Sequence, residues 1–338
     1  SRAKALRHSQ VICQRLDEKW LPMRLDAMGL GNVLTNDVKI VIAPTLSEAM
    51  QTYLQLKGIG RPKTFHRAAM RNAGVVIGQL GDRQLCDYST VDAGKVRDAL
   101  IDRGLSVLSV RRIFTTVKAV INLAIAEHGL DIRNAFAAIY MPEADSKKRV
   151  SIPAETIRQI QQSCMEHDDD MRWLVALISD TGMRLAEAAG LHLDDLRLDD
   201  DIPYVDIRPY PWRSLKTKGS QRQVPLVGAS LWAAQRIQAN ASSCFAFPRY
   251  TDKTHCNANS ASNALNKWIQ ANFRDDIVMH GFRHAMRDRL RAVSCPSEMI
   301  DQIGGWSSGK VGEGYGEGYT ISQLRGWILD LNRTIRGI

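Results

Sequence analysis

A change of texture at residues 141–150 constrains the fold more than any other feature of the chain. This stretch, MPEADSKKRV, is polar and charged, contains a proline and lacks hydrophobic periodicity, which is typical of a linker. The patterns before it are helical throughout, whereas those after it mix helices with two short strands. A length of 338 residues also exceeds what one ordinary core needs. The sequence therefore predicts two domains of different architecture, one on each side of this linker.

Four helical patterns precede the linker and predict a compact bundle over residues 44–140. They are APTLSEAMQTYLQLKG, TFHRAAMRNAGVVIGQLG, STVDAGKVRDALIDRG and SVRRIFTTVKAVINLAIAEHG, and each ends at a glycine, as helices commonly do. The first opens with a capping box, Thr45-x-x-Glu48. The last has an apolar stripe that we expect to face inward: Ile113, Val117, Val120, Ile121 and Leu123. Residues 1–43 are weakly patterned, and we interpret them as a partly helical N-terminal extension.

The excess of positive over negative charge lies entirely in the first part of the chain. Residues 1–150 hold 23 Lys and Arg against 14 Asp and Glu, whereas residues 151–338 hold 22 of each. A basic module joined to a neutral one suits a chain whose first part grips a polyanion through its phosphates. The outward basic residues of the last bundle helix are candidate DNA contacts: Arg111, Arg112 and Lys118. Because many proteins are mildly basic, the charge alone makes nucleic acid one candidate partner among several.

Several classes of protein are disfavoured by what the sequence lacks. Its apolar runs fall well short of the roughly 18 residues that a membrane span needs. Its first residues, SRAKALRHSQ, have no apolar segment of the kind that a secretory signal carries. Six scattered cysteines without a C-x-x-C pair favour reduced thiols over a disulfide framework or a zinc site. We therefore expect a cytoplasmic protein with no membrane segment and no metal site.

The second part contains polar residues where a plain core would not need them, beginning with DTGMRLAEAAGLHLDDL. Arg184 follows an apolar helix and begins another, with Glu187 one turn further on. An Arg/Glu pair at this spacing is commonly a surface ion pair of little energy. The apolar runs on both sides indicate instead that Arg184 lies near a buried junction, where a guanidinium needs an anionic partner.

A pair of lysines marks the connection between the two strand patterns, IPYVDIRPY and RQVPLV. Lys216 and Lys218 flank the expected hairpin tip, where either could reach out as a proton donor or a phosphate contact. Lysines also occur at hairpin tips simply because they keep the tip soluble. Further on, HGFRH places His280 and Arg283 three residues apart at the start of a helix, so that they share a face. Such a pair combines a proton carrier with a bidentate phosphate clamp.

The segment GGWSSGKVGEGYGEGY, residues 304–319, is poor material for a regular element because seven of its sixteen residues are glycine. It carries Trp306, Tyr315 and Tyr319. Read alone, it is typical of a surface loop with two aromatic side chains. Read with the preceding motifs, it completes a set of two arginines, a lysine, a histidine, an indole and a tyrosine. This set suits attack on a phosphodiester without a metal ion, since guanidinium groups neutralise the phosphate and tyrosine forms the covalent intermediate.

In this order and spacing the motifs resemble those of the tyrosine recombinases, or phage-type integrases. The resemblance covers residues 151–320 well, and residues 44–140 resemble the helical, SAM-like core-binding domain of that family. It implies a mainly α fold with a small antiparallel β-sheet (α+β), in which two domains form a C-shaped clamp around DNA. Residues 1–43 would then be the end of an arm-binding region or a linker from one. The terminal helix, residues 321–338, would dock either on a neighbouring protomer or on its own domain, and the sequence favours neither alternative.

The resemblance assigns roles to the first two motifs. Arg184 matches the first catalytic arginine of the family, and Glu187 matches the acidic residue that supports it. Lys216 is our choice for the hairpin lysine that acts as general acid, because hairpins written K-T-K-x-S-x-R usually use the first lysine. Lys218 is the alternative.

The later motifs receive roles in the same way. His280 and Arg283 match the H-x-x-R box of the family. Trp306 stands where most members have histidine, and would position the phosphate through its indole N–H. Tyr315, nine residues past Trp306, lies at the usual distance for the nucleophile, and Tyr319 is the alternative.

The resemblance further implies the activity and its partners. The protein would be a site-specific recombinase that cleaves and rejoins duplex DNA through a 3′-phosphotyrosyl intermediate, integrating or excising a mobile element. No cofactor or metal ion is implied, because the transesterification retains the bond energy. Expected partners are double-stranded DNA, three further protomers in the synaptic tetramer and accessory DNA-bending or directionality proteins. A bacterial or phage-encoded protein of the cytoplasm and nucleoid is expected. Two alternatives are a type IB topoisomerase-like activity and a DNA-binding regulator without strand transfer.

Overall fold

The computed structural model describes most of the chain. The described residues are 43–143, 151–306 and 318–336, together with six positions between residues 16 and 28. Most of the expected extension at residues 1–43 and most of the expected linker therefore lie outside the described residues, as does Tyr315.

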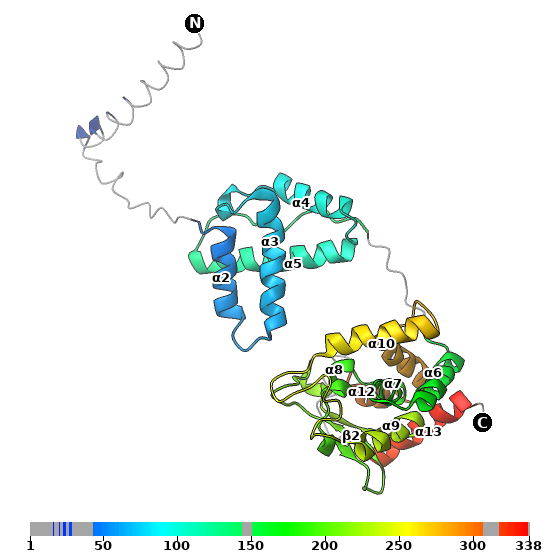
Figure 1. Cartoon of the computed structure of the whole chain (residues 1–338). Coiled ribbons are helices and arrows are strands. Elements are labelled where there is room, and N and C mark those ends of the chain that lie inside the picture. Colours follow the sequence, from blue (N-terminus) through cyan, green and yellow to red (C-terminus); the bar gives the residue numbers. More distant parts are fainter. Residues whose placement is uncertain are drawn as a thin grey trace. The chain divides into compact units, whose positions relative to one another are not determined.

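The chain divides into two compact units, residues 1–147 and 148–338 (Figure 1). The division falls within the polar stretch at residues 141–150 that separates the helical patterns from the mixed ones.

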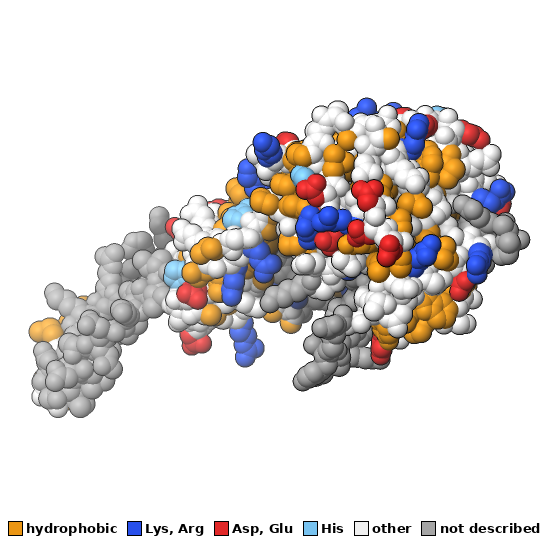
Figure 2. Space-filling model, turned by 90° about the horizontal axis from the view of Figure 1, so that it is seen from below, with side chains coloured by type: hydrophobic (Ala, Val, Ile, Leu, Met, Phe, Trp, Pro, Cys, Tyr) orange, Lys and Arg blue, Asp and Glu red, His pale blue; other side chains and the backbone are white. Residues whose placement is uncertain are grey.

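Figure 2 shows one face of the molecule, on which Lys and Arg side chains are interspersed with Asp and Glu side chains. On this face the positive charge is therefore spread over the surface and does not form one continuous patch.

The first unit is a helical bundle, as the sequence predicts. Its helices are α2 (Leu46–Lys57), α3 (Lys63–Leu80), α4 (Thr90–Asp102) and α5 (Val107–His128), with a 3-10 turn η2 (Leu85–Asp87). The Thr45–Glu48 capping box is present, and a second box at Ser89 begins α4. Helix α5 packs against α2, α3 and α4 and supplies the centre of the core, where Phe114 meets Phe136. The expectation that Leu123 faces inward is wrong, because its side chain is only partly buried and lines a surface hollow.

The second unit is also mainly helical. Its helices are α6 (Ala154–His167), α7 (Asp170–Thr181), α8 (Leu185–Ala189), α9 (Gly228–Ala239), α10 (Ala258–Asn272), α11 (Met279–Ala292), α12 (Ser297–Gly304) and α13 (Ile321–Arg336), with 3-10 turns η3 (Leu193–Asp195) and η4 (Lys218–Ser220). Helix α7 is the central element, since all of its residues from Leu174 to Thr181 are buried and it packs against α6, α9 and α11. A helix that is buried on all sides over two turns lies in the middle of a core.

A small antiparallel sheet lies beside the helices, in the order β1-β2-β3. The strands are β1 (Leu196–Arg197), β2 (Tyr204–Ile207) and β3 (Arg222–Pro225), with Val205 opposite both Leu196 and Val224. The mainly α fold with a small antiparallel sheet is therefore confirmed. The sequence overextended the first strand pattern to residue 210, because the chain leaves the sheet after Ile207. Strand β1 escaped notice because two residues are too short for an alternating pattern.

Helix α13 packs on its own unit. Leu324, Ile328 and Leu331 are buried in the same core as α6 and α11, and the helix also contacts β3. The capping pair at its start is present, since Thr320 N donates to Gln323 Oε1 at 2.9 Å and Gln323 N donates to Thr320 Oγ1 at 3.4 Å. The apolar stripe of this helix is thus covered within the protomer. Across the described parts of the chain, no helix is both long and apolar enough to cross a membrane.

Candidate active site

The site begins at the tight turn between α7 and α8. Helix α7 ends at Gly182, whose φ of +60° favours glycine. A Cβ at this position would also lie 2.8 Å from Met286 Cγ. The turn makes Arg184 the residue that caps α8, and its backbone N donates to Glu187 Oε2 at 2.9 Å. The backbone geometry therefore fixes where the first arginine leaves the chain.

The Arg184 side chain is held on three sides. Its Nη1 donates to Glu187 Oε1 at 2.5 Å and to Ser220 Oγ at 3.0 Å, and its Nη2 donates to Gly305 O at 3.2 Å. The side chain remains 22% exposed, whereas the Glu187 side chain is 4% exposed. Arg184 and Glu187 thus form a partly buried pair at a junction, with the guanidinium still accessible.

A second arginine, Arg222 at the start of β3, completes the support. Its Nη2 donates to Glu187 Oε2 at 2.9 Å, and its Nε and Nη1 donate to the backbone oxygens of Ile303 and Ser220. Burial disfavours the charged carboxylate, but Arg222 and Arg184 outweigh burial and hold the pKa of Glu187 below its usual value. Glu187 is therefore a carboxylate shared by two guanidinium groups.

Sequence reasoning missed Arg222 as a site residue. Its partners lie far along the chain, at Glu187 and Ile303, so that no local spacing reveals them. The available signal was a charged residue at the start of a short apolar strand, where it would be buried and require a partner.

Arg283 on α11 lies beside this pair and is itself buried. Its Nη1 donates to Gly182 O at 2.7 Å, while its buried Nη2 has no hydrogen-bond partner within the described residues. Burial, followed by the nearby positive charges of Arg184 and Arg222, lowers the pKa of Arg283 to about 9. A buried cationic N–H without an acceptor destabilises the fold unless an anion binds to it. The arrangement therefore suits an anion that Arg184 and Arg283 would share.

Trp306 holds Arg283 in place. Its ring lies 4.4 Å from the Arg283 guanidinium carbon and 5.0 Å from that of Arg287, distances typical of cation–π contacts. The backbone N of Trp306 donates to Asp301 O at 2.9 Å, so the ring is tied to the end of α12. A Cβ on Gly304 would lie 1.9 Å from the ring, and glycine is needed there to let the indole approach.

The remaining expected residues have different surroundings. His280, in the first turn of α11, is exposed and its ring lies 4.9 Å from that of His284, whereas Arg283 points into the core. The two side chains, one helical turn apart on α11, therefore differ in burial. Lys216 is exposed on the connection between β2 and β3, and Lys218 begins η4.

The two candidate tyrosines differ in what can be described. Tyr315 lies outside the described residues. Tyr319 donates its hydroxyl to Glu298 Oε2 at 2.8 Å, and its backbone exchanges two hydrogen bonds with the Gln302 side chain. The hydrogen bond to Glu298, then burial, raises the pKa of Tyr319. In this structure the Tyr319 hydroxyl is engaged by the Glu298 carboxylate.

In the first unit, two of the three expected DNA contacts bond to the backbone of their own unit. Arg111 Nη2 donates to Pro142 O at 2.8 Å and Lys118 Nζ to Ala137 O at 3.4 Å. Arg112 is exposed on the neighbouring face of α5. That face also carries Leu123, eleven residues further on, which lines a surface hollow.

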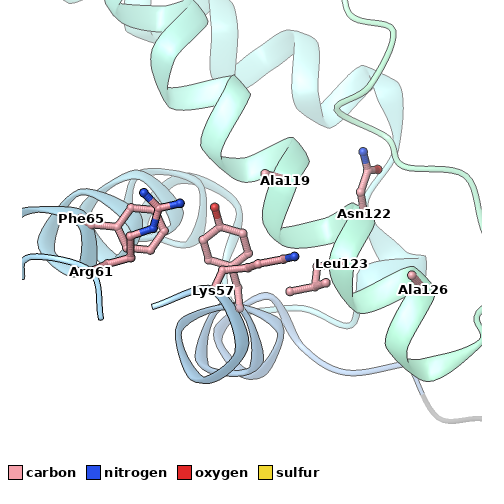
Figure 3. Close-up of a pocket in the computed structure, with 8 residues that line it drawn as sticks. Lys57, Arg61, Phe65, Ala119, Asn122, Leu123 and Ala126 are labelled. Carbon is pink, nitrogen blue, oxygen red and sulfur yellow. The ribbon is translucent and has the colours of Figure 1, made fainter. Parts of the chain in front are cut away.

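The hollow, of about 390 Å³, lies between α2, α3 and α5 (Figure 3). The Tyr53 and Phe65 rings stack in it at 5.9 Å, with the Arg61 guanidinium carbon 5.6 Å from the Phe65 ring. Lys57 of α2 points toward α5 (Figure 3). Two cations beside stacked aromatic rings, with no acidic residue in the lining, make this a candidate polyanion contact.

Comparisons with known proteins agree with this architecture. Residues 151–317 match the model of the Phage integrase family. The Tn1549 transposon integrase, solved with transposon right end DNA, has a TM-score of 0.61 at 16% identity, covering 86% of this chain and 98% of that one. A lambda integrase dimer bound to a COC′ core site has a TM-score of 0.62 at 17% identity, covering 92% of this chain and 87% of that one. A lambda integrase tetramer bound to a Holliday junction has the same TM-score and identity, covering 82% of each chain.

No curated protein matches the chain. The structural likenesses show that both units share the integrase fold. The family match spans the site arginines Arg184, Arg222 and Arg283. Fold and site together define a DNA strand-transferring enzyme. The chain belongs to the phage integrase family, the tyrosine recombinases.

Proposed function

We propose that this recombinase cleaves and rejoins duplex DNA at specific sites, with Tyr315 as nucleophile, and so integrates or excises a mobile element. The observation that carries the proposal is the buried Arg283 guanidinium, whose Nη2 has no acceptor within the described residues and which lies beside Arg184. A scissile phosphate would supply the missing acceptor and neutralise both cations. Fixed cations at the non-bridging oxygens favour the transition state, in which negative charge accumulates on them.

Each neighbouring residue has a role in this scheme. Glu187 and Arg222 hold Arg184, and Trp306 holds Arg283, so the two guanidinium groups meet the phosphate without rearrangement. The Tyr315 oxygen attacks phosphorus and the bond to the 5′-oxygen breaks. Lys216 protonates the leaving oxygen and His280 assists proton movement. Attack by the 5′-hydroxyl of the partner strand reverses the step and releases the tyrosine.

The contacts of Tyr319 support Tyr315 as the nucleophile. Using Tyr319 would require breaking its hydrogen bond to Glu298 and its pairing with Gln302. A raised pKa also makes the Tyr319 oxygen harder to deprotonate. Tyr315 also lies nine residues past Trp306, the usual distance to the nucleophile in this family.

We assign DNA contacts to both units. On the bundle, Arg112 and the two cations of the hollow, Lys57 and Arg61, would contact backbone phosphates, with Arg111 and Lys118 at the edge. Protomers would act as a tetramer on two duplexes, in the cytoplasm, with accessory bending or directionality proteins setting the outcome. The solved relatives bound to DNA as a dimer and as a tetramer support the DNA-bound, oligomeric part of this proposal.

Trapping on nicked DNA tests the proposal. A duplex nicked next to the cleavage site loses a short strand after attack, so that the covalent adduct accumulates and is resolved on a denaturing gel. We expect adduct from the wild type and from Tyr319→Phe but none from Tyr315→Phe. Adduct that persists in Tyr315→Phe and disappears in Tyr319→Phe would reverse the nucleophile assignment. Adduct that survives both changes would overturn the tyrosine mechanism.

A further inference from the structure

The connection between β2 and β3, residues 208–221, is anchored on both sides of Lys216. On its first side lies a group that we call the loop base: Arg208, Tyr210, Trp212 and Arg213. The backbones of Tyr210 and Arg213 exchange two hydrogen bonds of 2.9 and 3.0 Å, which close a tight turn. The chain therefore leaves the sheet and is fixed again before it reaches the lysine.

A buried carboxylate ties the loop base to the body of the unit. Asp195 is fully buried and accepts from the Tyr210 hydroxyl at 2.7 Å, from Arg208 Nε at 2.9 Å and from Arg213 Nη2 at 3.3 Å. Arg213 is buried as well, and its Nη1 donates to Glu187 O at 2.7 Å. Through this bond the loop base reaches the residue that holds Arg184.

Aromatic contacts stiffen the same structure. The rings of Trp212 and Tyr210 stack at 4.5 Å with an angle of 11°, and Trp212 meets Phe245 edge to face at 5.1 Å. Trp212 Nε1 donates to Gly190 O at 3.1 Å, on the turn that follows α8. The indole is half-buried and takes no part in the ion pairs of Asp195, which are made by Arg208 and Arg213.

The second side of Lys216 is held by a hydroxyl chain. Thr217 Oγ1 and Ser220 Oγ lie 2.9 Å apart, and the buried Ser220 accepts from Arg184 Nη1 at 3.0 Å. Between the anchors, Leu215 packs against the core. Lys216 is thus three residues from a buried arginine on one side and four from a buried serine on the other.

We propose that the loop base is a positioning element, which holds the Lys216 backbone at a set distance from Arg184 so that its ammonium meets the leaving 5′-oxygen. The inference rests on the proposed function, in which Lys216 is the general acid. In the step concerned, the Tyr315 hydroxyl gives up its proton, which His280 helps to carry away, as the tyrosine–phosphorus bond forms and the phosphorus–5′-oxygen bond breaks. The leaving oxygen takes the electron pair and receives its proton from the Lys216 ammonium.

A substrate with sulfur in place of the bridging 5′-oxygen separates positioning of the acid from other defects. A thiolate leaves without protonation, so a variant that lacks only the acid should recover activity on it. The variants are Trp212→Ala, which spares the buried ion pairs, Lys216→Ala as reference, and Ser214→Ala as matched control, an exposed residue of the same connection. Cleavage rates are measured for each with the oxygen and the sulfur substrate.

We expect Trp212→Ala to cleave the oxygen substrate about tenfold or more slowly, because an acid displaced by about 1 Å loses much of its effect. On the sulfur substrate its rate should return to within about threefold of wild type, as for Lys216→Ala, the spread expected when general-acid help is no longer needed. Ser214→Ala should behave as wild type on both.

An unchanged oxygen rate in Trp212→Ala, or a slow rate that sulfur does not restore while Lys216→Ala is restored, would overturn the positioning role. A Lys216→Ala variant that sulfur does not restore would remove the assignment of Lys216, and the positioning role with it. The tyrosine adduct of the wild type would still stand in that case, so the two failures are distinguishable.

Discussion

At the scale of single residues, Arg283 combines a requirement for catalysis with a cost in stability. Its guanidinium is buried, has one nitrogen without a hydrogen-bond partner among the described residues, and lies among other positive charges. We expect Arg283→Met to lower the cleavage rate by about 100-fold or more, the order seen when one transition-state donor is lost. Its unfolding free energy should change by no more than about 1 kcal/mol, because relief of the unpaired charge offsets the lost bond to Gly182.

Arg289→Met is the comparison, since Arg289 lies on the same helix and also has buried nitrogens without a partner among the described residues, but is paired with the buried Asp180. Removing it strands a buried carboxylate and should cost about 3 kcal/mol in urea unfolding. A loss of stability in Arg283→Met as large as that in Arg289→Met would contradict the assignment of Arg283 to an open anion site.

Glu187 gives a prediction that depends on pH. Because its folded-state pKa lies below the usual value, the stability that it contributes is complete above about pH 4.5 and is lost as pH falls through the lower folded pKa. Glu187→Gln should therefore unfold about 3 kcal/mol more easily near neutral pH, since Arg222 is left buried without its counter-charge. The difference from wild type should shrink below pH 4.5.

Urea unfolding between pH 3 and pH 7, a range spanning the ordinary carboxyl pKa, measures this difference. Glu166→Gln makes the same chemical change on an exposed residue and should show almost none of it. A constant difference across the range would show that the carboxylate charge of Glu187 is not what stabilises the pair.

At the scale of elements, the turn between α7 and α8 connects stability to the site. Gly182→Ala introduces strain at a φ of +60° and a Cβ 2.8 Å from Met286, next to Arg184 and under Arg283. We expect a loss of about 2–3 kcal/mol together with a loss of cleavage. Gly129→Ala is the control, because Gly129 ends α5 at a φ of +59° with no atom within 4 Å of a Cβ. It should lose about 1 kcal/mol and retain its cleavage rate. Thermal melts measure the loss of stability, and adduct formation measures the loss of cleavage. Comparing the two variants separates the effect of backbone strain from the effect of the position next to Arg184.

The elements also show why part of the site could be predicted from the sequence and part could not. Arg184 and Glu187 are three residues apart and Thr45 and Glu48 likewise, so one helical turn brings each pair together. Arg222 and Asp195 instead find their partners through the tertiary fold. Arg222 pairs with Glu187, 35 residues away, and Asp195 pairs with Arg213, 18 residues away. The periodicity of the local sequence does not indicate such contacts. The difference in burial between Arg283 and His280 could not be predicted for the same reason, because it depends on how α11 packs in the core.

At the scale of the whole molecule, the two units differ in charge, and this difference predicts how salt affects DNA binding. The excess of positive charge lies in residues 1–150, whereas Arg184 and Arg222 of the catalytic unit are paired with the buried carboxylate of Glu187. Each phosphate contact contributes a slope of about −0.9 to the dependence of log affinity on log salt concentration. The basic surface of the bundle should therefore supply most of the salt dependence, and the catalytic unit most of the chemistry.

The double variant Lys57→Ala/Arg61→Ala tests this division in the full-length chain. If both hollow cations contact phosphates, the magnitude of the slope should fall by about 2, with affinity reduced for specific and non-specific duplexes alike. Cleavage of DNA already bound at saturation should be unchanged, because the arginines around Glu187 are untouched. The control is Lys95→Ala/Arg103→Ala, which removes the same charge from exposed positions on and just after α4. Equal slopes for the two double variants would mean that net charge, rather than the hollow, governs binding. An unchanged slope in Lys57→Ala/Arg61→Ala would place the DNA on another face of the bundle.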